Sequence, residues 1–154
     1  MPASAPVLLL RERQGERRVL PIYIGRAEAA AIHVEMSGQR PARPLPHDLF
    51  GTFFENLDIQ VTRIAIVDID NGTFYAEMDL MQGRKATRIS LRPSDAVAIA
   101  VRLGTSIEVE EGVMDAAALP DEMPQDEAAD DGLLEDFRRF IDEVSPEDFS
   151  GDQS

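Results

Sequence analysis

Asn71-Gly72 is the feature that most restricts the fold of this 154-residue chain, because it stands between two long strand-like runs. Residues 59–70 (IQVTRIAIVDID) precede the pair, and residues 73–82 (TFYAEMDLMQ) follow it. Asn-Gly suits the two central positions of a type I′ turn, which joins antiparallel strands. In the second run the apolar residues alternate, which places on one face Phe74, Ala76, Met78 and Leu80. The chain is therefore expected to contain a long antiparallel hairpin with one buried face.

Local signals predict further elements on both sides of this hairpin. Strands are expected at residues 6–12, 18–25, 84–92 and 105–110, and helices at residues 26–38, 47–58, 94–104 and 111–119. Pro21 indicates an edge position or a bulge, because proline donates no hydrogen bond to a sheet. No nucleotide-type βαβ repeat with a glycine-rich turn is present. We therefore expect an α+β fold in one domain, residues 1–119, with helices packed on a mostly antiparallel sheet.

Acidic residues concentrate in the C-terminal part of the chain. Residues 1–110 carry 13 basic and 14 acidic side chains, a net charge of −1, whereas residues 111–154 carry 2 and 15, a net charge of −13. Residues 120–132 are acidic and contain proline, so a disordered linker is expected there. In the tail, residues 133–154, an amphipathic helix is expected at 133–144. That helix either docks on its own domain or binds a protein partner.

Several classes of protein are excluded by what the sequence lacks. The chain has no cysteine, so it forms no disulfide, no thiolate metal site and no cysteine nucleophile. Its longest apolar runs fall short of the roughly 18 residues of a membrane span. The opening residues MPASAPVLLLRER do not read as a signal peptide. A soluble cytoplasmic protein that uses no membrane is therefore expected.

Two helices are preceded by a similar polar segment. Arg43-Pro44 comes before His47-Asp48 at one helix start, and Arg92-Pro93 comes before Ser94-Asp95 at the other. Either these residues only begin their own helices, or the two starts fold together into one polar site.

The order and spacing of several motifs resemble the bifunctional nuclease domain family. The motifs are LPIYIG followed by EAAAI, then RPLPHDL, GTFYAEMDL and RPSDAVAIAVR, spread over about residues 6–119. The tail FRRFIDEVSPEDF is similar to that of actinobacterial members. Members usually have a further strand before the position of Met1 and a threonine where this chain has Pro46. The family is also known as a bacterial domain of unknown function, and its plant members are credited with DNase and RNase activity.

The resemblance implies hydrolysis of phosphodiester bonds in DNA or RNA, in which Mg²⁺ is the expected cofactor. The polar residues available for this chemistry are Glu28, Arg43, His47, Asp48, Arg92 and Asp95. His47 suits a general base, since histidine titrates near neutral pH. Asp48, Asp95 and Glu28 offer the oxygen ligands that Mg²⁺ prefers. Arg92, with Arg43 as a second cation, is expected to bind the phosphates of nucleic acid.

Each of these residues also has a simpler explanation. Ser94 is a common N-cap residue, and Asp48, Asp95 and Glu28 lie in first helical turns, where the helix dipole favours a carboxylate. The local sequence contains no PD…ExK or HNH-like nuclease signature. The alternative function is a non-catalytic regulatory or interaction module that binds a partner through residues 133–144. A homodimer is expected from the family and from the tendency of open sheet edges to pair.

Overall fold

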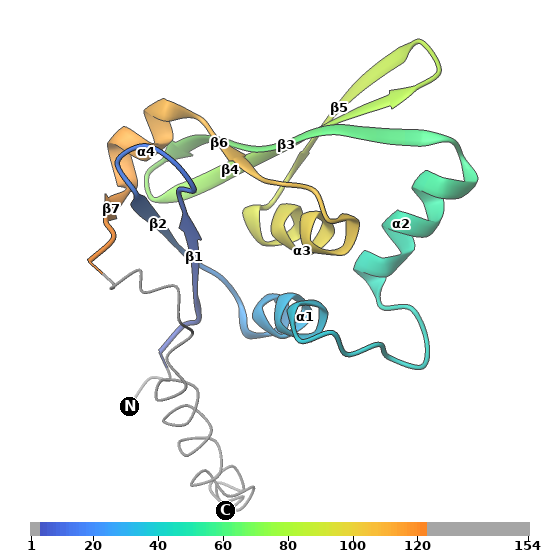
Figure 1. The fold of residues 1–154 in the computed structure, drawn as a ribbon, viewed down its shortest axis with the longest axis horizontal. Coiled ribbons are helices and arrows are strands. Elements are labelled where there is room, and N and C mark those ends of the chain that lie inside the picture. The colour runs from blue at the N-terminus through green and yellow to red at the C-terminus, as the bar shows by residue number, and fades with distance from the viewer. Residues whose placement is uncertain (1–3, 123–154) are drawn as a thin grey trace, which may run out of the picture. The chain divides into compact units, whose positions relative to one another are not determined.

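The computed structural model describes residues 4–122 (Figure 1). Their strands are β1 Val7–Arg11, β2 Arg18–Tyr23, β3 Ile59–Asp70, β4 Thr73–Gln82, β5 Lys85–Leu91, β6 Glu108–Val109 and β7 Leu119–Pro120. Their helices are α1 Arg26–Met36, α2 Pro46–Asn56, α3 Pro93–Leu103 and α4 Glu111–Ala117. The predicted α+β class is confirmed. Within these residues no helix is both long and apolar enough to cross a lipid bilayer. Most of the predicted linker and the helix at 133–144 lie outside the described residues.

The strands form two sheets rather than the single sheet expected. Their orders are β1-β2-β7 and β5-β4-β3-β6, and every pairing is antiparallel except that of β3 with β6. The hairpin of β3 and β4 is confirmed, with positive φ at both Asn71 (49°) and Gly72 (78°). The face of β4 expected to be buried holds the buried residues Ala76, Met78 and Leu80. The β2–β7 pairing covers only two residues of β2, so Pro21 lies where that side of the strand has no partner.

Helix α3 lies at the centre of the fold, between the four-stranded sheet and α1 (Figure 1). Pro93 begins the helix, and Gly104 ends it in the left-handed conformation at φ 65°. Seven of its residues are buried: Pro93, Ser94, Ala96, Val97, Ala98, Ile99 and Ala100. Because most of them are small, the helix can approach both neighbouring layers closely. The start of α3 is thereby fixed against the rest of the core.

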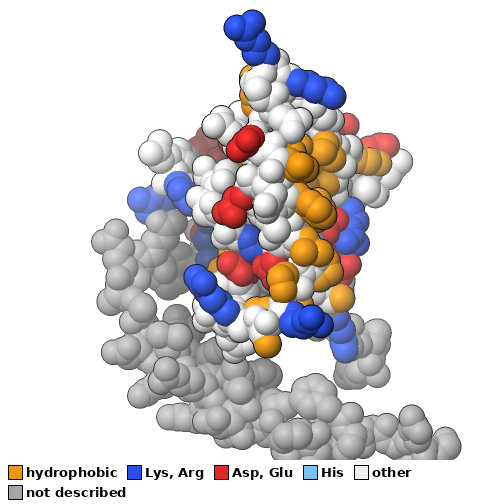
Figure 2. All heavy atoms as spheres, turned by 90° about the vertical axis from the view of Figure 1, so that its right-hand side faces the viewer, with side chains coloured by type: hydrophobic (Ala, Val, Ile, Leu, Met, Phe, Trp, Pro, Cys, Tyr) orange, Lys and Arg blue, Asp and Glu red, His pale blue; other side chains and the backbone are white. Residues whose placement is uncertain are grey.

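The large apolar side chains of helix α2 lie mostly outside the core. Only Phe54 is buried, whereas four large apolar residues are between 41% and 56% exposed: Leu49, Phe50, Phe53 and Leu57. Figure 2 shows hydrophobic side chains gathered in a stripe on this side of the molecule. Helix α2 therefore contacts the core through a narrow line and leaves most of its apolar side chains in solvent.

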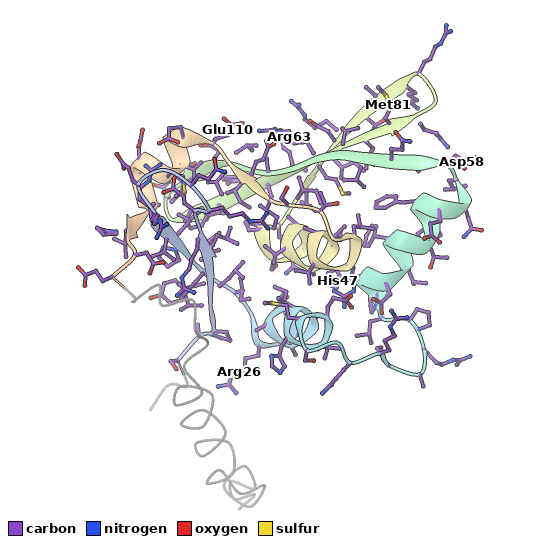
Figure 3. All side chains as sticks on the ribbon, viewed as in Figure 1. Arg26, His47, Asp58, Arg63, Met81 and Glu110 are labelled. Atoms are coloured by element: carbon purple, nitrogen blue, oxygen red, sulfur yellow. The ribbon has the colours of Figure 1, made fainter. Side chains whose placement is uncertain are left out.

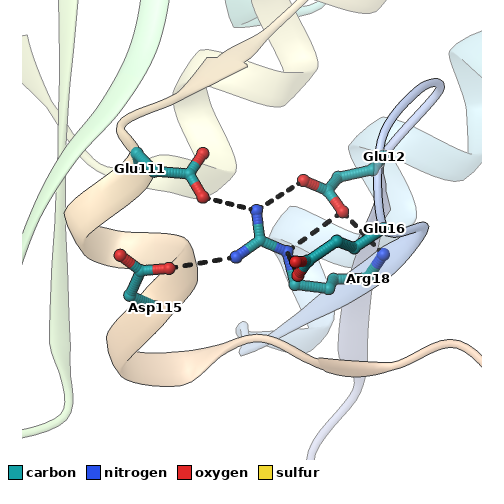
Figure 4. Close-up of polar contacts among 5 residues, drawn as sticks. All are labelled: Glu12, Glu16, Arg18, Glu111 and Asp115. Carbon is teal, nitrogen blue, oxygen red and sulfur yellow. Dashed lines mark hydrogen bonds and ion pairs between the residues drawn. The ribbon is translucent and has the colours of Figure 1, made fainter.

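A single arginine joins the β1–β2 hairpin to α4 (Figure 4). The Arg18 guanidinium lies 2.7 Å from Oε1 of Glu12 and 2.7 Å from Oε1 of Glu111. It also contacts Asp115 at 3.1 Å and Glu16 at 3.6 Å. The hydrogen bonds that Arg18 donates to Glu12 and then to Glu111 raise the pKa of Arg18 above its ordinary value. This ion-pair cluster holds the small sheet in place and is separate from the two helix starts described next.

Candidate functional site

The two proline-marked helix starts meet in the folded chain. His47 is the second residue of α2 and lies beside α3 (Figure 3). Its Nε2 atom is 3.0 Å from Oδ1 of Asp95, the third residue of α3. The two side chains are 17% and 25% exposed. Residues 48 positions apart in the sequence thus form one polar contact.

Arg92 extends this contact into a chain of four charged or titratable side chains. Its Nε donates to Oδ2 of Asp95 at 2.8 Å, and its Nη2 donates to Oδ1 at 3.1 Å. Its Nη1 donates to Oε1 of Glu28, on α1, at 3.0 Å. The cluster, consisting of Glu28, Arg92, Asp95 and His47, therefore draws on three helices. The Arg92 side chain is 63% exposed, so the guanidinium is open to solvent.

The charge state of Asp95 determines which nitrogen of His47 carries the proton. The hydrogen bonds from Arg92 are the largest cause of a lowered pKa of Asp95; burial opposes them, and His47 lowers the pKa further. Asp95 is therefore ionised near neutral pH and only accepts hydrogen bonds. Neutral His47 must then carry its proton on Nε2 and its lone pair on Nδ1. Among residues 4–122 the His47 ring makes no second hydrogen bond, so Nδ1 can accept a proton.

The Glu28 carboxylate lies against the glycine before its helix. A Cβ atom on Gly25, the N-cap residue of α1, would collide with the Glu28 carboxylate. A hydrogen bond from its own backbone amide and then the contact with Arg92 lower the pKa of Glu28. Glu28 is therefore an ionised partner that restrains Arg92 from the side of α1.

The capping explanation is wrong for Ser94 and holds in part for Asp48. Arg92 occupies the N-cap position of α3, and no side chain there makes a capping hydrogen bond. Pro93 is the first residue of α3, so Ser94 lies inside the helix, and it is buried. At α2, Oδ2 of Asp48 accepts a hydrogen bond from the Leu45 amide at 2.7 Å. Asp48 thus stabilises the first turn of its own helix.

Asp48 also pairs with Arg102, a residue that the sequence analysis did not single out. Nε of Arg102 donates to Oδ1 of Asp48 at 2.6 Å, and the arginine also donates to the carbonyl oxygens of Ala98 and Ala31. The Arg102 side chain is only 6% exposed. Burial raises the pKa of Asp48, but the Leu45 amide and then Arg102 lower it by more, so the pKa lies below its ordinary value. Arg102 consequently ties the start of α2 to α1 and α3.

The three carboxylates expected to bind Mg²⁺ do not converge on one point. Glu28 and Asp95 both face Arg92, whereas Asp48 faces Arg102. Arg102 follows Asp95 by seven positions on α3, which corresponds to about 10 Å along the helix axis. Across residues 4–122 no group of three or more His, Cys, Asp or Glu side chains is arranged to hold a metal ion. The predicted ligand set therefore does not fit a Mg²⁺ site in this structure.

A pocket of about 560 Å³ opens beside His47. The connector between α1 and α2 and the facing sides of α2 and α3 form its walls, lined among others by Arg40, Pro44, His47, Asp48, Glu55 and Arg102. Arg43, the second cation expected to bind nucleic acid, is exposed on the same connector but does not line the pocket. Arg40, three residues earlier on the connector, lines the pocket.

One sequence signal would have revealed Arg102, and none would have revealed Arg40. Seven residues make nearly two helical turns, so Asp95 and Arg102 lie on one face of α3. That face meets α2 at both ends, first through His47 and then through Asp48. Arg40 and Arg43 lie three positions apart on a connector of irregular structure, where spacing does not predict orientation.

Comparison with known proteins agrees with the motifs noted in the sequence. The family model described as "Bifunctional nuclease domain" matches residues 8–122. Two uncharacterized proteins of Mycobacterium tuberculosis, Rv1829 of strain H37Rv and MT1877 of strain CDC 1551, are each 49% identical over 154 residues. Each alignment covers 96% of this chain and 90% of the relative.

Two plant proteins are more distant relatives. Bifunctional nuclease 2 of Arabidopsis thaliana is 27% identical over 147 residues, and the alignment covers 87% of this chain and 44% of the plant protein. Bifunctional nuclease 1 of the same plant is 24% identical over 110 residues, which covers 70% of this chain and 34% of the relative. The motifs, the family match and these relatives together show that the chain belongs to the bifunctional nuclease domain family.

Proposed function

We propose that this protein hydrolyses phosphodiester bonds of DNA or RNA, with His47 as the general base. The observation that carries the proposal is the 3.0 Å contact between Nε2 of His47 and Oδ1 of Asp95 at the edge of an open pocket. A carboxylate that fixes the tautomer of a histidine leaves the other ring nitrogen ready to take a proton. The family match and the printed names of the two plant relatives support nucleic acid as the substrate.

In the proposed reaction, Nδ1 of His47 takes a proton from the water molecule that attacks phosphorus. The bond between phosphorus and the leaving oxygen then breaks, and that oxygen takes a proton from solvent. Asp95 holds the imidazole in place and stabilises its protonated form, as a carboxylate does in other histidine–aspartate pairs. General base catalysis of this kind contributes about 10²–10⁴-fold to a rate.

Arg92 is the cation proposed to contact the scissile phosphate. Three of its N–H groups are occupied by Asp95 and Glu28. An arginine has five N–H donors in a planar fork, so two remain for a phosphate oxygen. The 63% exposure of the side chain leaves room for this contact. Arg43 is proposed as an outer contact with the nucleic acid backbone.

The proposal is tested by assaying cleavage of single-stranded RNA and of plasmid DNA by the purified full-length protein. Each substrate is incubated with Mg²⁺, with Mn²⁺ and with a chelator, so that the metal dependence is measured in the same experiment. His47→Ala should lower the rate by about 10²–10⁴-fold. Asp95→Asn should also lower the rate strongly, because an amide can donate to Nε2 and place the histidine proton on Nδ1.

The other histidine provides a matched control. His33 is exposed on α1, and among residues 4–122 it makes no side-chain hydrogen bond or ion pair. His33→Ala should therefore cleave at the wild-type rate. Equal cleavage by the wild-type, His47→Ala and Asp95→Asn proteins would contradict the proposed site.

Several expectations from the sequence stay predictions. They are the use of Mg²⁺, the homodimer, the cytoplasmic location and the alternative role as a non-catalytic interaction module. The last depends on residues 133–144, which lie outside the described residues.

A further inference from the structure

The pocket beside His47 contains two charged side chains whose charges are not neutralised within the pocket. Most of its titratable residues already have partners. Arg102 pairs with Asp48 at 2.6 Å and lies 4.0 Å from Glu35, and His47 pairs with Asp95. Arg40 and Glu55 also line the pocket, but within the described part of the chain neither makes a side-chain hydrogen bond or an ion pair.

Arg40 and Glu55 belong to different walls of the pocket. Arg40 lies on the connector that follows α1, and Glu55 lies in the last turn of α2. Both are exposed, so each can meet a ligand without breaking an existing contact. A ligand that binds both side chains must present an anionic group to Arg40 and hydrogen-bond donors to Glu55.

Part of the remaining pocket lining is apolar, which gives a ring a surface to pack against. Apolar side chains line it at Pro41, Pro44, Ile99 and Leu103. The volume of about 560 Å³ lies within the range of about 300–1,000 Å³ found for small-molecule sites. A mononucleotide combines an anion, a flat ring and edge donors in a body of this size.

We propose that this pocket binds one unpaired guanine nucleotide, with its phosphate on Arg40 and its base edge on Glu55. Guanine presents N1–H and N2–H₂ side by side, so one carboxylate can accept a hydrogen bond from each of them. Uracil instead places carbonyl oxygens on both sides of its only N–H, and these repel a carboxylate. This inference rests on the proposed nuclease function and deepens it, because it names the base that is held next to His47.

The same contacts exclude a paired base. In a duplex, N1–H and N2–H₂ of guanine donate hydrogen bonds to cytosine and are not available to Glu55. Recognition through the Watson–Crick edge is typical of proteins that bind single strands. The substrate class is therefore single-stranded nucleic acid that contains guanine.

Calorimetric titration of the full-length protein with guanosine 5′-monophosphate, uridine 5′-monophosphate and guanosine tests this inference. Guanosine monophosphate should bind about tenfold or more tightly than uridine monophosphate, in line with the discrimination of one bidentate base contact. Glu55→Gln should remove that difference, because an amide presents only one acceptor oxygen. Arg40→Ala should weaken binding of both monophosphates and make guanosine monophosphate bind no better than guanosine.

Two variants outside the pocket serve as controls. Arg26→Ala removes an exposed arginine at the other end of α1, and Asp70→Asn changes an exposed carboxylate at the far end of β3. Both should bind all three compounds as the wild type does. Equal affinity for the two monophosphates, or an unchanged preference in Glu55→Gln, would overturn the inference.

These measurements also separate the inference from the catalytic proposal. A nucleoside monophosphate has no phosphodiester bond, so its binding is measured without turnover. Selective binding of guanosine monophosphate in a protein that cleaves no nucleic acid would uphold the pocket and refute the nuclease. Cleavage that depends on His47, in a protein that binds the two monophosphates equally, would support the nuclease and refute the guanine pocket.

Discussion

Helices α2 and α3 have the same length, begin with proline and carry an aspartate in the first turn, yet they occupy different environments. Seven residues of α3 are buried, whereas Phe54 is the one buried residue of α2. The helix with the larger apolar side chains is the more exposed of the two. Small side chains let α3 fit between a sheet and a helix, while the bulky face of α2 has no such partner among residues 4–122. The comparison shows that an apolar stripe reveals which side of a helix is apolar but not whether that side is covered.

Truncation of one apolar side chain on each helix should give the largest difference in the free energy of unfolding. Ile99 is 2% exposed, so Ile99→Ala should lower the free energy of unfolding by about 2–5 kcal/mol. Phe53 is 56% exposed, so Phe53→Ala should change it by about 0.5 kcal/mol or less. Urea unfolding followed by circular dichroism measures both values. A large loss in Phe53→Ala would mean that another surface covers α2 in solution.

Substitution of the two arginines that pair with the first-turn aspartates should give a smaller difference in the free energy of unfolding. Arg102→Met leaves the Asp48 carboxylate partly buried without its strongest side-chain partner, which should cost about 1–3 kcal/mol. Arg92→Met removes an exposed ion pair and should cost about 0–1 kcal/mol. The same unfolding experiment measures both. If Arg92→Met proved the more costly, the cluster around Asp95 would be the main support of the fold.

Acid should reduce the contributions of both aspartates. The folded-state pKa values of Asp48 and Asp95 lie below their ordinary values. Their stabilisation is therefore fully present above the unfolded pKa of about 3.9 and is lost as the pH falls through the folded pKa. Asp48→Asn and Asp95→Asn should each be less stable than wild type near neutral pH, by about 1 kcal/mol. Unfolding curves measured down to about pH 2 should show the difference closing below about pH 4. A constant difference would show that the carboxylate charge is not responsible.

Local signals in the sequence predicted most of the fold. The turn at Asn71-Gly72, the helix-ending Gly104 and the alternation in β4 each depend on residues close together in the chain. Strand β7 and the shortness of β6 were not predicted, because a pairing of two residues leaves no periodic pattern. The division into two sheets depends on long-range packing, which spacing along the chain does not encode.

The candidate site was predicted only in part, because it also depends on long-range packing. His47, Asp95, Arg92 and Glu28 were selected by residue type, and the structure brings them into one cluster. Asp48 was expected to bind Mg²⁺ together with Asp95 and Glu28, but its carboxylate turns to Arg102 at the other end of α3. The direction in which a side chain points at a helix start depends on its neighbours in space. That information became available only with the packing of α3 against α2.

The contact between His47 and Asp95 joins parts of the chain that are made at different times. During synthesis His47 leaves the ribosome first, and its carboxylate partner follows 48 residues later. The nascent chain therefore has no oriented base until Asp95 has emerged and α3 has packed against α2. Dependence on a late partner would keep the proposed nuclease inert until translation has passed α3.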